Sequence, residues 1–153
     1  MSKNPMTNSQ IARQRRLSTL TKAPMDRLTV LWNAYGAQPR HDLVRPAETG
    51  TVMVRGRVGA IGSAFNLGET TVTRCSVRLE DGTLGHGYVQ GRDKTAARTI
   101  ALIDALAEAG EAARIDAEIT TPLVEEAAAR KAARAARAAA TKVEFFTMVR
   151  GEG

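Results

Sequence analysis

Aromatic residues, cysteine and histidine are all scarce in this chain of 153 residues, and each shortage narrows what the protein can do. Aromatic residues make up 4% of the sequence, so alanine and aliphatic side chains must supply most of a thin core. Cys75 is the single cysteine, which excludes an internal disulfide and fits a reducing compartment. His41 and His86 are far apart in the sequence and have no cysteine cluster beside them, so no metal site is expected.

Long hydrophobic runs are also missing. No stretch of about 18 apolar residues occurs, so the chain is not expected to span a membrane. Residues 1–8 lack the apolar segment of a signal peptide, and we therefore expect a cytoplasmic protein. With 43% hydrophobic and 25% charged residues, the composition indicates a folded chain rather than a disordered one.

The net charge of +6 is concentrated near the N-terminus. Residues 1–37 carry six basic groups against Asp26 alone, whereas residues 38–153 carry sixteen basic and fifteen acidic groups. This asymmetry predicts a basic N-terminal helical arm over residues 1–37 and a single α+β domain over residues 38–153. Through residues 13–27 the arm could bind nucleic acid, an acidic partner or only water. The lack of stacking aromatics among its arginines argues against nucleic acid.

Hydrophobic periodicity and punctuation by glycine and proline predict the elements. Helices are expected over residues 8–22, from Asp26 to Gly36, from Asp93 to Gly110, and from Thr121-Pro122 onward. A connector is expected over 39–46. Strands are expected at Thr51–Arg57, Thr70–Leu79, Leu84–Gln90 and Val143–Val149. The predicted fold is α+β, an antiparallel sheet of a central hairpin plus the C-terminal strand, covered by helices from both ends.

The glycine-rich segment Gly56–Gly68 is the one candidate for contact with a small anion. Its backbone amides could cradle a phosphate group of a substrate, with Arg57 or Arg74 adding charge. It leads into a strand and not a helix, so it is neither a Walker loop nor a dinucleotide-binding turn. An irregular connection between strands is the interpretation that the spacing favours. Cys75 lies on the more apolar face of its strand and is expected to be an inert buried thiol.

No Ser/His/Asp or Cys/His set is evident, so no catalytic residue is predicted. Two other features could form interfaces. Arg130, Arg134 and Arg137 share one helix face, which is either solvated or a docking surface for a carboxylate-bearing neighbour. In the predicted C-terminal strand Phe145 and Phe146 point in opposite directions, so one of them, with Met148 nearby, is expected to lie against a helix of this chain or a neighbouring subunit.

Eight segments, in order from residue 45 to residue 151, carry a family resemblance. They are Arg45–Gly50, Val54–Arg57, Thr71–Arg74, Val77–Gly85, Val89–Asp93, Ala101–Leu106, Thr121–Leu123 and Phe145–Gly151. Together they resemble the PhnG family, one of the components of the bacterial carbon–phosphorus lyase core complex. One departure is Ala60, where the family usually has a second glycine.

The resemblance implies an accessory subunit in organic phosphonate catabolism. With the H, I and L subunits such a chain supports a transferase that displaces adenine from ATP with a phosphonate, giving α-D-ribose 1-methylphosphonate 5-triphosphate. It also implies assembly with the H, I and J subunits, the last of which later cleaves the carbon–phosphorus bond. MgATP is then a substrate of the complex, and this chain alone is expected to bind no cofactor and to catalyse nothing.

Overall fold

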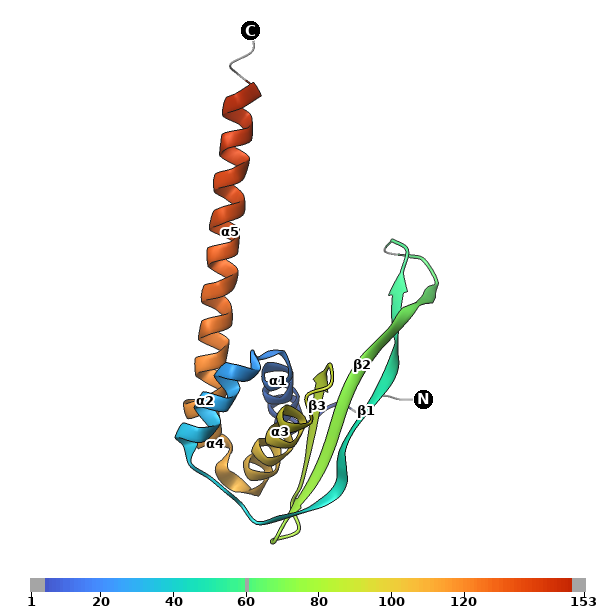
Figure 1. Cartoon of the computed structure of the whole chain (residues 1–153), viewed down its shortest axis with the longest axis vertical. Coiled ribbons are helices and arrows are strands. Elements are labelled where there is room, and N and C mark those ends of the chain that lie inside the picture. Colours follow the sequence, from blue (N-terminus) through green and yellow to red (C-terminus); the bar gives the residue numbers. More distant parts are fainter. Residues whose placement is uncertain (1–4, 60, 150–153) are drawn as a thin grey trace.

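The computed structural model describes residues 5–59 and 61–149, with side chains described as far as residue 141. A three-stranded antiparallel sheet in the order β1-β2-β3 has helices on one face only (Figure 1). The α+β class, with helices from both ends of the chain, is therefore confirmed. The elements are α1 (Asn8–Lys22), α2 (Met25–Tyr35), β1 (His41–Arg57), β2 (Ala64–Leu79), β3 (Leu84–Gln90), α3 (Lys94–Leu106), α4 (Ala112–Ile115) and α5 (Thr121–Val149).

Local capping chemistry explains where α1 and α3 begin and where α2 ends. Thr7 and Gln10 form a reciprocal capping box at the start of α1. The carboxylate of Asp93 accepts a hydrogen bond from the Ala96 amide at 2.8 Å and caps α3. Gly36 adopts a left-handed conformation, with φ of 76°, and ends α2 as expected. Gly110, with φ of 118°, interrupts the π-helical turn Ala107–Glu111 that follows α3.

The first two strands are much longer than predicted. β1 begins at His41 and so includes most of the predicted connector, with irregular pairing between Arg45 and Glu48 around Pro46. At the other end Arg57 pairs with Ala64, which leaves only residues 58–63 for the turn. Most of the supposed glycine loop is thus a paired ladder, because pairing with β2 satisfies backbone groups that a loop would leave to water.

The prediction of a C-terminal strand is wrong. Val143–Val149 continues α5, and the sheet of the described chain consists of β1, β2 and β3. The preceding residues are mostly alanine and arginine, both strong helix formers, and extending a helix costs less than starting a new element. The opposite projection of Phe145 and Phe146 from a strand is wrong with it. The side chains of both phenylalanines and of Met148 lie outside the described part of the structure.

The core lies between the sheet and the helices. Cys75 and Val77 of β2 pack with Ile100 and Ile103 of α3, and Cys75 is only 1% exposed, so the buried thiol is confirmed. Burial raises the pKa of this thiol. Leu20 of α1 belongs to the same cluster, as do residues of α2. The hydrophobic core therefore contains residues from both sides of position 37.

Tyr35, the last residue of α2, is a buried member of this core. Its ring stacks on Trp32 with centroids 5.9 Å apart, and the guanidinium of Arg114 lies 4.1 Å from its centroid. Its hydroxyl donates to the carboxylate of Glu111. Burial, helped by Glu111, raises the pKa of Tyr35 to about 12.

We therefore expect Tyr35 to stay protonated well above the ordinary tyrosine range. Because the folded-state pKa is raised, its stabilising effect is fully present below pH 10 and is lost as the pH rises through about 12. Tyrosinate absorbance recorded within milliseconds of a pH jump measures this ionisation before the chain unfolds. The Tyr35→Phe variant should lack the ionisation step near pH 12. Persistence of this step in the variant would contradict its assignment to Tyr35.

Candidate functional site

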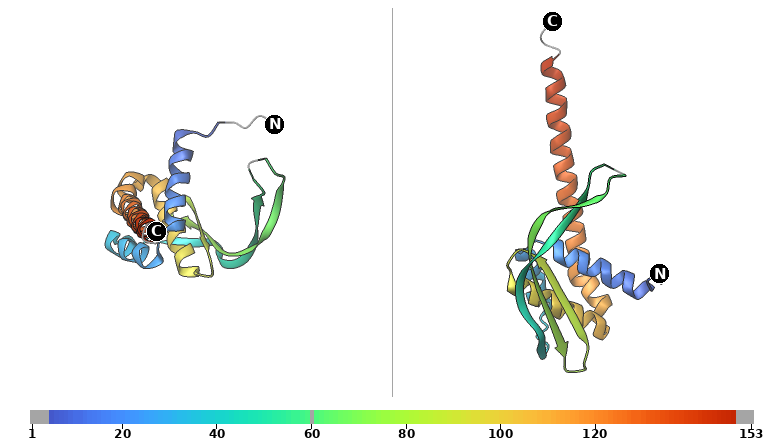
Figure 2. Two further views of the ribbon diagram at one scale, coloured as in Figure 1. Left: turned by 90° about the horizontal axis from the view of Figure 1, so that it is seen from above. Right: turned by 90° about the vertical axis from the view of Figure 1, so that its right-hand side faces the viewer.

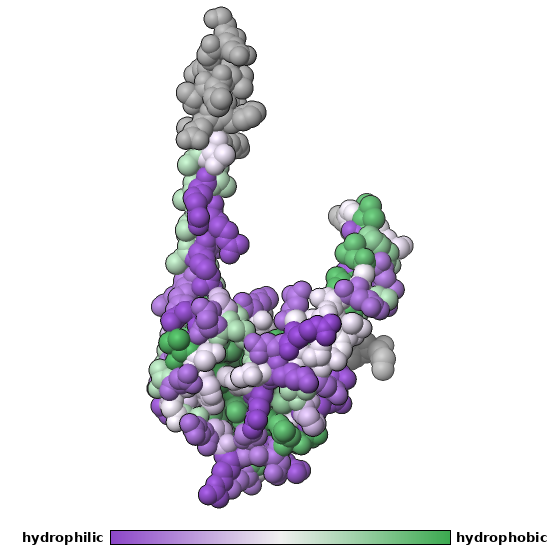
Figure 3. Space-filling view, in the orientation of Figure 1, coloured by the Kyte–Doolittle hydropathy of each residue, from purple (hydrophilic) through white to green (hydrophobic). Residues whose placement is uncertain are grey.

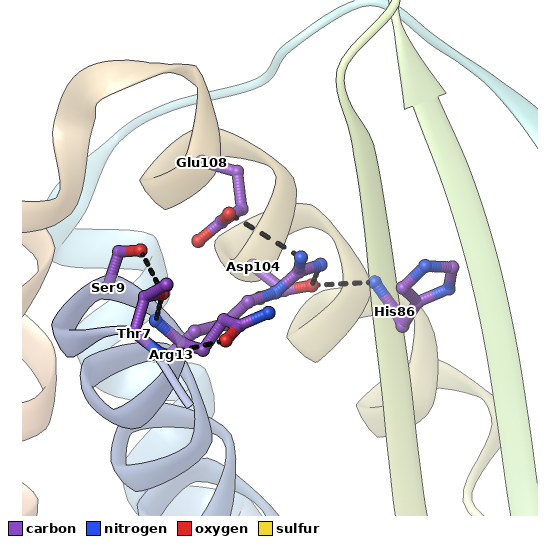
Figure 4. Close-up of polar contacts among 7 residues, drawn as sticks. Thr7, Ser9, Arg13, His86, Asp104 and Glu108 are labelled. Carbon is purple, nitrogen blue, oxygen red and sulfur yellow. Dashed lines mark hydrogen bonds and ion pairs between the residues drawn. The ribbon is translucent and has the colours of Figure 1, made fainter. Parts of the chain in front are cut away.

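Arginines of the N-terminal arm form ion pairs with carboxylates of the same chain. Arg13 Nη2 lies 2.7 Å from Asp104 Oδ2, and Asp104 also accepts a hydrogen bond from the His86 amide at 2.9 Å (Figure 4). Arg16 pairs with Asp116 at 2.9 Å, and this contact lowers the pKa of that carboxyl group. No local pattern in the sequence signals these pairs, because their partners lie about a hundred positions away.

Arg27 likewise forms an ion pair with a carboxylate of the same chain. It donates to both carboxylate oxygens of Glu126, the shorter distance being 2.6 Å, and the contact lowers the pKa of Glu126. Three arginines of residues 13–27 thus anchor α1 to α3 and to the helical turn at Asp116, and α2 to α5. A guanidinium paired with a carboxylate has its charge largely neutralised and fewer free N–H donors for a phosphate group. This geometry weakens the nucleic-acid interpretation of the arm.

The outer face of the sheet carries a small charged cluster. Glu48 Oε1 accepts hydrogen bonds from Arg45 at 2.9 Å and from Arg74 at 3.0 Å. Arg74 and Tyr88 also line a pocket of about 250 Å³ on this face. The Arg74 side chain is 57% exposed, so solvent screens the pair and an anion could compete for the guanidinium.

Arg57 and Arg74 are not brought together. Arg57 is exposed near the tip of the β1–β2 hairpin, opposite Ala64, and Arg74 lies ten residues further along β2. At a strand rise of 3.3 Å per residue the separation is about 30 Å, so one phosphate group cannot contact both. Each residue separately stays a prediction of substrate contact, which adenine release by the assembled Arg57→Ala and Arg74→Ala variants would test.

A serine–histidine contact on the outer face was missed by sequence reasoning. Ser76 Oγ lies 2.9 Å from His86 Nδ1, because the two residues are paired across β2 and β3. The Asp81-Gly82 turn fixes this register, so the sequence signal was present. Among the described residues, no acidic side chain is hydrogen-bonded to the His86 ring. The contact is therefore a cross-strand pair that lacks the third member of an acyl-transfer triad.

Metal binding and membrane insertion receive no support from the described chain. Its histidine, cysteine and acidic side chains form no group of three that could hold a metal ion. His41 contacts Arg98 at 2.9 Å, whereas His86 contacts Ser76, so the two histidines have different partners. Within residues 5–59 and 61–149, none of the helices is long and apolar enough to cross a bilayer.

Two elements project from the body (Figures 1 and 2). One is the distal β1–β2 hairpin, whose tip carries hydrophobic surface in Figure 3. The other is α5, on which every described residue from 127 to 141 is exposed, including the predicted docking residues Arg130, Arg134 and Arg137. Exposed apolar surface of this kind is typical of a protein–protein contact. The structure thus defines a small α+β protein with two exposed projections, one apolar and one basic.

Comparison with known proteins gives the family. The family model described as phosphonate metabolism protein PhnG matches residues 11–151. The chain is also 45% identical over 145 residues to the alpha-D-ribose 1-methylphosphonate 5-triphosphate synthase subunit PhnG of Rhizobium meliloti (strain 1021), covering 92% of this chain and 90% of the relative. The chain belongs to the PhnG family of phosphonate metabolism proteins, which confirms the resemblance.

Proposed function

We propose that this chain is an accessory subunit of the carbon–phosphorus lyase system. With the H, I and L subunits it supports transfer of ribose triphosphate from ATP to methylphosphonate, with release of adenine. The observation that carries the proposal is the 45% identity, over nearly the whole chain, to a subunit of a synthase named for that product. In this proposal MgATP is a substrate of the complex, and the chain acts in the cytoplasm.

The geometry of the described residues supports a role in assembly more than a role in chemistry. The Ser76–His86 contact lacks an orienting carboxylate, and the described side chains form no metal cluster. The apolar hairpin and residues 127–141 of α5 leave surface that the described residues do not cover. The alternative of a nucleic-acid-binding module is less well supported, because Arg13, Arg16 and Arg27 hold carboxylates of the same chain.

Co-expression tests this proposal directly. We expect the tagged chain to elute in one complex with the H, I and J subunits from the cytoplasmic fraction. The isolated chain should release no adenine from MgATP, whereas the complex supplemented with the L subunit and methylphosphonate should do so. Failure of the chain to elute with any of these proteins would contradict the proposal, as would adenine release by the isolated chain at about 1 per second.

A further inference from the structure

The two projections leave the body on the same side. In Figure 1 the distal hairpin and α5 both rise from the layer formed by the sheet and α1–α3, and the view from above in Figure 2 (left) shows them apart. We call residues 51–59 and 61–67 the apolar prong and residues 127–141 of α5 the basic prong. A body of protein placed between them would contact both.

The apolar prong has nothing to cover it within the described chain. The register of β3 with β2 ends at Gln90 and Val72, followed by one hydrogen bond from the Gly91 amide to the Thr71 carbonyl. Beyond this point, among the described residues, β1 and β2 pair only with each other. Isolated two-stranded ribbons are marginally stable in water. Seven of its large hydrophobic side chains are nevertheless exposed, and Ile61 at the turn is 98% exposed. They are Val52, Met53, Val54, Val58, Ile61, Phe65 and Leu67. Such a ribbon gains stability when a partner buries these side chains.

The basic prong has the opposite chemistry. Residues 127–141 contain Arg130, Lys131, Arg134 and Arg137 and no acidic residue. The remaining positions, apart from Thr141, are all alanine, which lets another backbone approach closely. In Figure 3 hydrophilic side chains project from α5 on the side of the hairpin. A matching surface must therefore supply anionic groups, either carboxylates or phosphates.

The charges also favour one kind of partner. The apolar prong itself carries Arg55 and Arg57 without an acidic residue, and the whole chain has a net charge of +6. A second copy would thus bring like charges against both prongs. Nucleic acid would suit the basic prong, but it offers little to bury the exposed aliphatic side chains around Ile61. The fitting partner is a different protein with an apolar cleft beside an acidic surface.

We propose that the two prongs hold one and the same partner protein, with the hairpin tip in its apolar cleft and α5 along its acidic surface. This inference rests on the proposed function, because the partner is sought among the H, I and J subunits. It assigns the row of Arg130, Arg134 and Arg137 a defined role. That role is to grip carboxylates of the protein that also buries Ile61.

Site-specific crosslinking tests whether the two prongs contact one protein. Cys75 is 1% exposed and its thiol pKa is raised by burial, so an introduced surface cysteine will react selectively with a maleimide. Ile61→Cys probes the apolar prong, and Ala133→Cys probes the basic prong one turn from Arg130 and Arg137. Glu80→Cys, in the turn at the far end of the sheet, serves as the matched control. Each variant is labelled with benzophenone maleimide before it is combined with the H, I and J subunits, and the assembled complex is then purified and irradiated.

We expect the two prong variants to crosslink to the same protein, identified by mass spectrometry, and the control to crosslink to that protein in much lower yield. Crosslinks to two different subunits, to a second copy of this chain or to co-purified nucleic acid would overturn the inference. The two proposals fail separately. If the unmodified chain does not elute with the H, I and J subunits, the proposed function is wrong; if it does elute but the crosslinks diverge, only the shared-partner inference is wrong.

A charge-reversal variant gives a second readout. Arg130→Glu combined with Arg134→Glu should lower the salt concentration at which the complex dissociates, because the contact is expected to depend on screened charge. Ile61→Ser should weaken assembly while leaving the unfolding temperature of the isolated chain unchanged, since this side chain contacts mainly solvent. Assembly of both variants with the salt tolerance of the unmodified chain would overturn the inference.

Discussion

Gly87→Ala is expected to lower the free energy of unfolding by about 3 kcal/mol, at the upper end of the usual cost of overpacking. Gly87 lies on β3 where α3 rests directly on the strand. A methyl group there would collide with the carbonyl oxygen of Ala97 and lie 2.8 Å from the amide nitrogen of Ala101. These are backbone atoms of α3, so no side-chain rotation relieves the clash and the helix must move off the sheet. Urea unfolding followed by circular dichroism measures the loss.

Gly50→Ala is the matched control for this substitution. Gly50 is also a strand glycine, but an added methyl group meets no atom within 4 Å, and its φ does not lie in the left-handed region. The control should change the free energy of unfolding by less than about 1 kcal/mol. Equal unfolding midpoints for the Gly87 and Gly50 variants would show that α3 does not seat on β3 as described.

Asp104→Ala is expected to cost about 3–5 kcal/mol, the usual effect of breaking a buried ion pair by removing one partner. The Asp104 side chain is fully buried and joins three elements (Figure 4). It accepts two hydrogen bonds from Arg13 of α1, at 3.0 and 2.7 Å, and one from the His86 amide of β3. The alanine variant leaves a guanidinium and a backbone amide without this acceptor. The Arg13 side chain is 30% exposed and can recover some hydration, which places the expected loss at the lower end of the range.

Glu80→Ala is the control for the carboxylate. Glu80 pairs with Arg40 at 3.8 Å, and both side chains are largely exposed, so its removal should cost less than about 1 kcal/mol. A double-mutant cycle with Arg13→Ala separates the coupling of the pair from the cost of burying either group alone. A coupling energy near zero, or equal losses in the Asp104 and Glu80 variants, would contradict the view that this ion pair ties α1 to the sheet.

Family membership and element type were readable from the sequence where the signals are local. Thr7, Gly36 and Asp93 mark helix ends because capping depends on a few neighbouring backbone groups. The Asp81-Gly82 turn placed β3 at Leu84–Gln90, as observed. The same turn fixes the register that pairs Ser76 with His86, although the sequence reasoning did not use it.

The extent of the long hairpin and the state of the C-terminal segment could not be read in this way. Alternating residues such as those of Val143–Val149 suit a strand only if a neighbouring strand edge exists, and the structure continues α5 instead. Conversely, most of the connector expected over residues 39–46 belongs to β1. Pro46, which has no amide proton to donate, lies in an irregular stretch of the pairing with β2. Both outcomes depend on partners distant in the sequence.

The sequence by itself determined the class of fold, the family, the positions of most helix ends and the concentration of basic residues near the N-terminus. Tertiary structure alone decided what those basic residues do, because Arg13 meets Asp104 and Arg16 meets Asp116 only when α1 packs against α3 and the helical turn that contains Asp116. It also decided that the apolar hairpin and α5 rise from one side of the body. The physical reason is the separation along the sequence of the residues that interact. Caps and turns are set by adjacent residues, whereas ion pairs and projecting surfaces are set by contacts that form only on folding.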